Sequence, residues 1–133
     1  MSTIRTVAAA MLVIGGSLTA QLAPAQSTGL GRTDVLQHDL DTPGREVVQV
    51  RVDFGPGVVA PRHSHPGVEV AYVLEGTIEY QIDGKPPVVL KTGDALFIPN
   101  GAVHTARNIG STKASELATY IVEKGKPAFV PAK

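Results

Sequence analysis

From residue 46 onward, short runs of β-forming residues alternate with turn sequences, and this pattern limits the chain to an all-β fold. Val48, Val50, Val52 and Phe54 alternate with polar residues, which is the period of a half-buried strand. Further β-rich runs follow at residues 68–74, 77–82, 87–90, 95–98, 103–108 and 116–122. Gly, Pro and Asp turns separate them. This succession predicts a small antiparallel sandwich or barrel, because closure removes exposed sheet edges.

The composition narrows the classes of function. A chain of 133 residues has room for one ordinary domain, and its 12 basic residues balance its 12 acidic residues. The chain has no Cys, so disulfides, thiolate chemistry and zinc fingers are excluded. It has no block of like charges, so the sequence indicates no nucleic-acid or anionic-membrane partner. A small-molecule or metal role is left.

Residues 1–25 have the features of a secretory signal peptide. Arg5 is their only charge, an apolar stretch covers residues 7–20, and Ala23-Pro24-Ala25 fits a cleavage site before Gln26. The alternative is a membrane anchor, but Gly and Ser residues interrupt the stretch, which is too short to span a bilayer. We therefore expect a periplasmic or secreted protein without a stable membrane anchor.

The rest of the chain divides into three parts. Residues 26–45 are polar and turn-rich, and we expect a lead-in segment with at most one short strand around residues 35–36. Residues 46–124 carry the β-rich runs and form the predicted barrel. Residues 125–133 contain two prolines and are predicted to be an extended tail.

Three histidines and one glutamate are candidate metal ligands. His63 and His65 are two residues apart, so on a strand their imidazoles point to the same face. Glu69 follows a Pro-Gly turn that could return its carboxylate to the same place, and His104 lies far along the chain. This set suits Fe, Mn, Ni, Cu, Co or Zn as a divalent ion, with positions left for water or substrate.

Two ordered patterns surround these ligands. The first is G-x5-H-x-H-x3-E-x6-G over residues 57–76, and the second is G-x5-P-x-G-x2-H-x3-N over residues 93–108. Both patterns resemble the two motifs of the cupin superfamily. The resemblance implies a jelly-roll β-barrel with the metal held by His63, His65, Glu69 and His104. The short gap between the motifs is similar to that of compact single-domain bacterial cupins, including those named quercetin-dioxygenase-like.

Other residues in or near the motifs have structural interpretations. The motif glycines are expected in turns, and Asn108 is expected to bond to backbone across strands. Arg62 is expected to point away from the metal by strand alternation, and His38, in a polar context, is expected to be a surface residue. Three aromatic residues are interpreted as core or interface residues first and pocket residues second: Tyr72, Tyr80 and Phe97.

The ligand set allows two principal functions. A divalent ion beside one carboxylate keeps a formal charge of plus one, which favours an anionic enolate, carboxylate or phenolate ligand. The first hypothesis is a dioxygenase-like enzyme or a Lewis-acid isomerase with Glu69 as the catalytic base. The sequence indicates no other acid or base near the motifs. The second is a non-catalytic periplasmic module that binds a small ligand or the metal; a structural metal is a third.

The run at residues 68–74 also predicts an interface. Val70, Tyr72 and Leu74 lie on one face of this strand, and Ala71 and Val73 lie on the other. Only one face of a strand can meet the barrel interior, so another element must cover the second. The N-terminal segment or a partner chain could do so, and we expect a homodimer.

Overall fold

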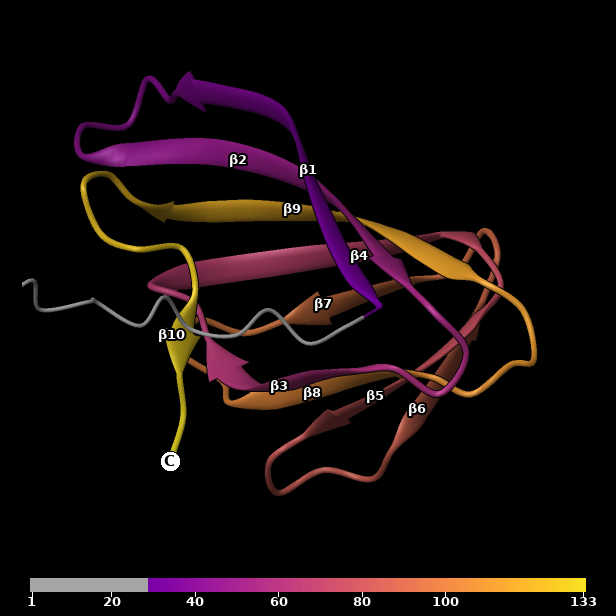
Figure 1. Cartoon of the computed structure of the whole chain (residues 1–133). Helices are drawn as coiled ribbons and strands as arrows, with labels where there is room; N and C mark the ends of the chain where they lie inside the picture. Colours follow the sequence, from indigo (N-terminus) through magenta and orange to yellow (C-terminus); the bar gives the residue numbers. More distant parts are fainter. Residues whose placement is uncertain (1–28) are drawn as a thin grey trace, which may run out of the picture.

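The computed structural model describes residues 29–133, which form two five-stranded antiparallel sheets. The first sheet has the order β1 (Leu30–Asp39), β2 (Arg45–Phe54), β9 (Ala114–Glu123), β4 (Gly67–Glu75) and β7 (Ala95–Ile98). The second has the order β10 (Val130–Pro131), β3 (Val59–Ser64), β8 (His104–Asn108), β5 (Thr77–Ile82) and β6 (Val88–Lys91). Figure 1 shows the two sheets stacked face to face. The predicted all-β jelly-roll barrel is confirmed.

The core lies between the sheets and follows the sequence alternation. On β2 the side chains of Val50, Val52 and Phe54 are buried, and on β5 those of Ile78 and Tyr80 are buried. The intervening residues of both strands are half-buried on the outer faces. Burial of these apolar side chains stabilises the barrel by roughly 1.5–3 kcal/mol for each large aliphatic or aromatic residue.

Strand β1 is longer than the sequence predicted. We expected at most one short strand in the lead-in segment, but residues 30–39 form a ten-residue strand that pairs with β2 along its length. The pairing shifts register between Asp34 and Leu36, which marks a β-bulge. This expectation was wrong because β1 is an edge strand exposed on both faces, so its sequence needs no apolar alternation.

The structure describes the C-terminal end of the sequence but not the first 28 residues. The predicted signal peptide and its cleavage site lie outside the described residues. Within residues 29–133 the structure contains no helix that is long and apolar enough to cross a membrane. Within the C-terminal tail, which was expected to be extended, residues 130–131 form the short strand β10, which pairs with β3.

The structural roles assigned to the motif residues are confirmed. The glycines at positions 57, 76, 93 and 101 have φ angles between 72° and 93°, which a side chain would disfavour. Asn108 is fully buried, and its amide nitrogen donates to the carbonyls of Phe54, Gly55 and Thr112 at 2.7–3.2 Å. It therefore ties the end of β2 to the loop between β8 and β9.

Candidate metal centre

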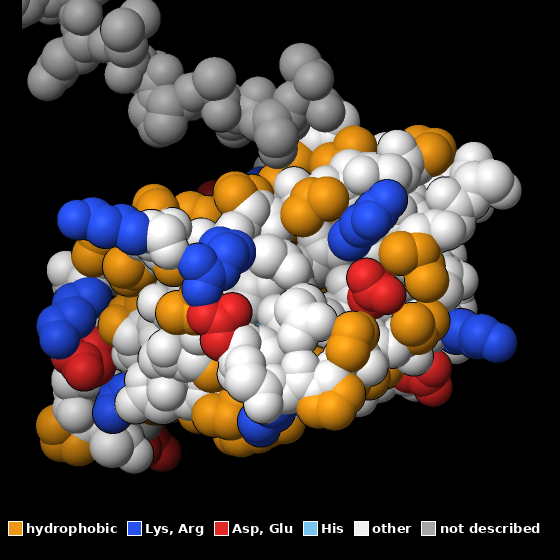
Figure 2. All heavy atoms as spheres, turned by 90° about the horizontal axis from the view of Figure 1, so that it is seen from below, with side chains coloured by type: hydrophobic (Ala, Val, Ile, Leu, Met, Phe, Trp, Pro, Cys, Tyr) orange, Lys and Arg blue, Asp and Glu red, His pale blue; other side chains and the backbone are white. Residues whose placement is uncertain are grey.

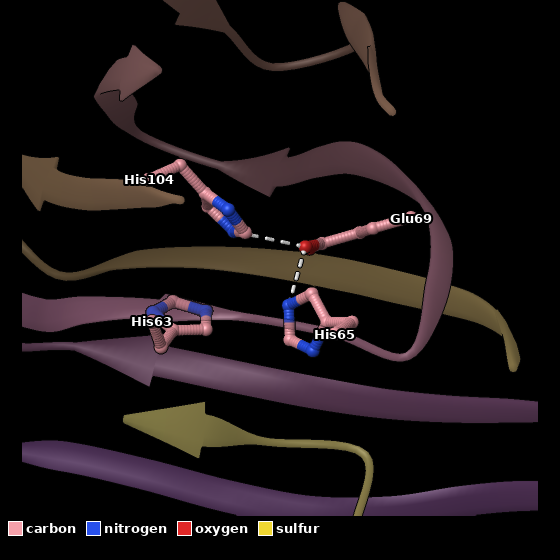
Figure 3. Close-up of side chains that lie close together, drawn as sticks. All are labelled: His63, His65, Glu69 and His104. Carbon is pink, nitrogen blue, oxygen red and sulfur yellow. Dashed lines mark hydrogen bonds and ion pairs between the residues drawn. The ribbon is translucent and has the colours of Figure 1, made fainter. Parts of the chain in front are cut away.

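The four predicted ligands meet inside the barrel (Figure 3). His63 on β3 and His104 on β8 belong to the second sheet, Glu69 on β4 belongs to the first, and His65 lies in the link between β3 and β4. One ligand atom from each residue lies within 4.8 Å of the others. All four residues are at most 5% exposed. Consistent with this burial, Figure 2 shows no histidine on the outer side of the second sheet.

The chain reversal after His65 brings Glu69 back to the histidines. β4 begins at Gly67, directly after Pro66, and pairs with β9 from its first residue. A Cβ atom at Gly67 would lie 2.0 Å from the carbonyl oxygen of Ile121, so only glycine permits this close approach of the two strands. The reversal therefore carries the chain from one sheet to the other within the first motif.

Each imidazole is oriented by a backbone carbonyl. Nδ1 of His63 lies 2.6 Å from the carbonyl oxygen of Pro61, and Nδ1 of His104 lies 2.9 Å from that of Ala102. Nδ1 of His65 is hydrogen-bonded to the carbonyl of Ala128. A ring that donates from Nδ1 in its neutral form has its lone pair on Nε2. All three rings can therefore present Nε2 to the centre, as metal-binding histidines commonly do.

The protonation states also suit a metal. Burial alone would raise the pKa of Glu69, but the hydrogen bond to His104 and the nearby His65 imidazole lower it to about 2. Burial lowers the pKa of His63 to about 4. Burial would lower the pKa of His104, but its hydrogen bonds to Glu69 and Ala102 and the charges of Glu69 and Glu116 together raise it. At neutral pH the centre thus contains an ionised carboxylate and a neutral His63, the forms that bind divalent ions.

One buried atom tests whether a metal fits. Nε2 of His65 lies 2.9 Å from an Oε2 of Glu69 but has no hydrogen bond of acceptable geometry. A buried nitrogen without such a partner is costly. An ion among the four ligand atoms would satisfy this nitrogen. The donor set of three imidazoles and one carboxylate therefore fits a divalent transition-metal ion.

The barrel interior also holds Glu116 and Tyr120, which were not predicted as site residues from the sequence. Glu116 on β9 is 5% exposed, and the hydroxyl of Tyr80 donates to its carboxylate. Burial and the charge of Glu69 raise the pKa of Glu116 to about 8. Tyr120 packs its ring against His65, with 4.4 Å between ring centroids. Strand alternation could have identified both residues from the sequence, because Glu116 and Tyr120 occupy inward positions of β9.

The remaining candidate residues lie outside the centre. His38 is exposed on β1, and Arg62 points outward to pair with Asp83, as expected. Tyr80 is a core residue, whereas Tyr72 and Phe97 are 43% and 58% exposed on the outer face of the first sheet. These two aromatic residues therefore lie where an interface, and not the barrel core, could use them.

No cluster residue lines either of two hollows on the described part of the chain. One hollow of about 520 Å³ lies among residues 29–31, 53–55 and 113. A second of about 220 Å³ lies beside β1, among residues 34–37 and Val48. The four residues of the cluster are at most 5% exposed, and neither of these hollows reaches them.

Comparison with known proteins places this site in a family. The cupin domain family matches residues 50–120, more than half of the chain. A germin-like protein of subfamily 2 from Arabidopsis thaliana is 37% identical over 75 residues, which cover 53% of this chain and 34% of that protein. The chain thus spans about a third of this relative.

Two of the solved structures that resemble this chain are enzymes. A recombinant oxalate oxidase in complex with glycolate has a TM-score of 0.64 and 28% identity, over 80% of this chain and 57% of that chain. The DMSP lyase DddQ from Ruegeria pomeroyi DSS-3 has a TM-score of 0.58 and 28% identity, over 65% of this chain and 43% of that chain. The family match, the barrel and the His-His-Glu-His cluster agree, and the chain belongs to the cupin family.

Proposed function

We propose that this chain is an exported cupin that binds one divalent transition-metal ion and acts on a small anionic or enolic substrate. The observation that carries the proposal is the buried cluster of His63, His65, Glu69 and His104, with its ligand atoms within 4.8 Å of one another. Fe, Mn, Ni, Cu, Co and Zn all accept such a ligand set. Four protein ligands leave at least one position for water or a substrate oxygen in a five- or six-coordinate site.

The charge of the centre supports an anionic substrate. One carboxylate neutralises half the charge of a divalent ion, so the loaded centre keeps a formal charge of plus one. Enolates, carboxylates and phenolates offer the matching negative oxygen. The solved oxalate oxidase relative was studied in complex with glycolate, a small carboxylate of this class.

In the proposed enzyme, the ion and the protein residues would have different roles. When bound, the ion supplies Lewis acidity toward a substrate oxygen or activation of O₂, as in dioxygenase-like or isomerase chemistry. Glu69 is the proposed catalytic base, because its carboxylate lies at the centre and would accept a proton after leaving the ion. The closed walls of the barrel would exclude bulk water from the reacting groups.

A second candidate is a non-catalytic module that binds a small ligand or the metal itself. The burial of the cluster favours it, because all four ligands are at most 5% exposed and neither hollow described above reaches them. The two candidates differ in turnover. An enzyme must admit and release its substrate repeatedly, whereas a metal-binding module needs only to hold its ion.

We further propose that the protein is a homodimer in the periplasm or outside the cell. Export is supported by the signal-peptide features of residues 1–25. Dimerisation is supported by the outer face of β4 and β7, where Val70, Tyr72 and Phe97 are 37–58% exposed. Val70 and Phe97 are direct partners in the register of the two strands, so the apolar patch is continuous. A second copy offers the same apolar surface across a two-fold axis.

Metal analysis followed by a substrate screen tests the proposal. The protein would be loaded separately with each candidate ion, and bound metal would be measured per chain. Oxygen uptake would then be followed with flavonols, catechols, oxalate, glycolate and small enols, and isomerisation would be followed by NMR. Stoichiometric metal with turnover of one substrate class supports the enzyme. Stoichiometric metal with ligand binding and no turnover supports the second candidate.

A further inference from the structure

The C-terminal segment, residues 125–133, crosses the barrel end that contains the metal centre, and we call it the strap. In Figure 1 its yellow ribbon leaves the first sheet and runs past the edge of the sandwich to the second. Within it, Val130 and Pro131 of β10 pair with Ser64 and His63 of β3. The backbone amide of Ala132 donates to the carbonyl of Arg62 at 3.0 Å.

The strap contacts two of the four ligands directly. The carbonyl of Ala128 is hydrogen-bonded to Nδ1 of His65. The ring of Phe129 stacks on His63, with 4.5 Å between centroids and 21° between planes. Phe129 is half-buried, so its ring forms part of the wall between the centre and solvent.

The source of the orienting carbonyl separates His65 from the other two histidines. For His63 and His104 the partner carbonyl belongs to the residue two positions earlier, so it is fixed by the same stretch of chain. For His65 the partner lies 63 positions away, on the strap. The hydrogen bond that holds His65 in its metal-binding orientation therefore exists only while the strap is in place.

The strap itself is lightly held. Gly125, Lys126 and Pro127 are exposed, β10 has only two residues, and Val130 is 42% exposed. The ion pair between Lys126 and Glu123 is also exposed, and such pairs add little stability. A segment with few buried apolar contacts opens at lower free-energy cost than the core strands.

We propose that the strap is a positioning element of the metal centre, and that metal or substrate exchange requires it to lift. The Ala128 carbonyl fixes the orientation of His65, and the Phe129 ring covers His63. Displacing the strap frees one ligand to rotate and opens a path to a centre that is otherwise buried. This inference rests on the proposed metal binding, but the strap should also orient His65 in the metal-free protein.

The first test measures the rate at which a chelator removes the ion from metal-loaded protein. Phe129→Ala should raise this rate by about 10- to 100-fold, the effect typical of losing an outer contact of a metal ligand. Phe129→Tyr keeps the stacked ring and should restore slow release. Val130→Ala is the matched control, because it truncates an exposed neighbour on the same segment. Equal release rates from Phe129→Ala and the unchanged protein would overturn the proposal.

A covalent lock tests the same idea in the opposite direction. Val130 and Ser64 are direct antiparallel partners, and the chain has no native Cys, so Val130→Cys with Ser64→Cys allows one cross-strand disulfide. Oxidised protein should release metal more slowly than protein reduced with a non-thiol reductant. Val130→Cys alone should respond to neither treatment. Release at the same rate from locked and reduced protein would contradict the requirement for lifting.

The metal-free protein gives a readout that does not depend on metal binding. NMR of the imidazole nitrogens should show His65 protonated on Nδ1 in the unchanged protein and a mixture of tautomers in Phe129→Ala. If the protein binds no metal but the tautomer changes, the proposed function fails and the positioning role stands. If metal binds and the His65 tautomer is the same in both proteins, the positioning role fails.

Discussion

His63 on β3 and His104 on β8 are direct partners in the antiparallel register of the second sheet, and their ring centroids lie 4.3 Å apart. This pairing places one ligand from each sequence motif on neighbouring strands. The link from β3 to β4 then adds His65, and β4 of the first sheet adds Glu69. The four candidate ligands therefore meet because the two sheets close into a barrel. Loss of one ligand should weaken metal binding by the whole set.

Replacing His104 by Ala should reduce bound metal to a small fraction of one ion per chain. The change removes one of three imidazoles and leaves Glu69 without its bond to Nε2 of His104. His38→Ala is the matched control, because it removes an exposed histidine on β1 and should leave the metal content unchanged. Metal per chain is measured by elemental analysis after gel filtration. Full metal occupancy in His104→Ala would contradict the ligand assignment.

Replacing Glu69 by Gln separates binding from catalysis. Gln keeps an oxygen ligand but loses the negative charge and the ability to accept a proton. Metal affinity should fall about 10- to 100-fold, whereas activity on an identified substrate should fall about 10²- to 10⁴-fold, the loss typical of a missing general base. Affinity is measured by competition with a chelator and activity by initial rates. Glu75→Gln, an exposed change at the end of β4, should alter neither. Full activity in Glu69→Gln would remove Glu69 as the base.

The buried Glu116 should make stability depend on pH. Its pKa is raised to about 8 in the folded protein, mainly by burial, from 4.5 as its ordinary value. Between these two values the folded state binds more protons than the unfolded state. The contribution of Glu116 to stability therefore falls as pH rises through this window.

Glu116→Gln tests this dependence, because Gln cannot ionise and still accepts the hydrogen bond of Tyr80. The melting temperature of the metal-free variant, relative to that of the unchanged protein, should rise between pH 5 and pH 9. We expect a change of at least about 4 °C, which corresponds to about 1 kcal/mol in a domain of this size. Glu79→Gln, on the outer side of β5, is the control. A constant difference across this range would show that Glu116 is ionised in the folded protein.

Asn108 should be a stability residue with no role at the metal. Ala at this position leaves the carbonyls of Phe54, Gly55 and Thr112 without their donor in a buried site. The free energy of unfolding should fall by at least about 2 kcal/mol, measured by chemical denaturation. Asn100→Ala changes an exposed turn residue and should have little effect. Metal affinity of folded Asn108→Ala should match that of the unchanged protein, and a selective loss of metal would assign it a different role.

The proposed dimer should depend on the outer face of β4 and β7. Phe97→Glu places a charge at a residue that is 58% exposed in the single chain and buried in the proposed dimer. Light scattering after gel filtration should show a dimer for the unchanged protein and a monomer for the variant. Ile109→Glu is the control, because Ile109 is also exposed but follows β8 of the second sheet. A monomeric unchanged protein would contradict the dimer.

The parts of the fold that the sequence predicted are those with one buried face. Residues 77–82 and 95–98 match β5 and β7 at both ends, because alternation and flanking turns define them. The edge strand β1 was missed because an exposed strand carries no apolar period. β1 pairs with β2 through backbone hydrogen bonds, and these do not depend on the pattern of side chains.

The four residues of the centre could be predicted from the sequence, but the contacts that support them could not. The motif spacing identified all four residues of the cluster. It could not show that Ala128 orients His65, because that contact depends on where an extended tail crosses the barrel. Glu116 shares the interior with Glu69 only through the packing of β9 beside β4, which sequence spacing does not express.

The most direct test of the account is a crystal structure of the metal-loaded protein, with the ion identified by its anomalous scattering. We predict one ion, with Nε2 of His63, His65 and His104 and one carboxylate oxygen of Glu69 at about 2.0–2.3 Å. At least one further coordination position should hold water or a small anion. An ion bound elsewhere, or held by fewer than three of these four residues, would contradict the account.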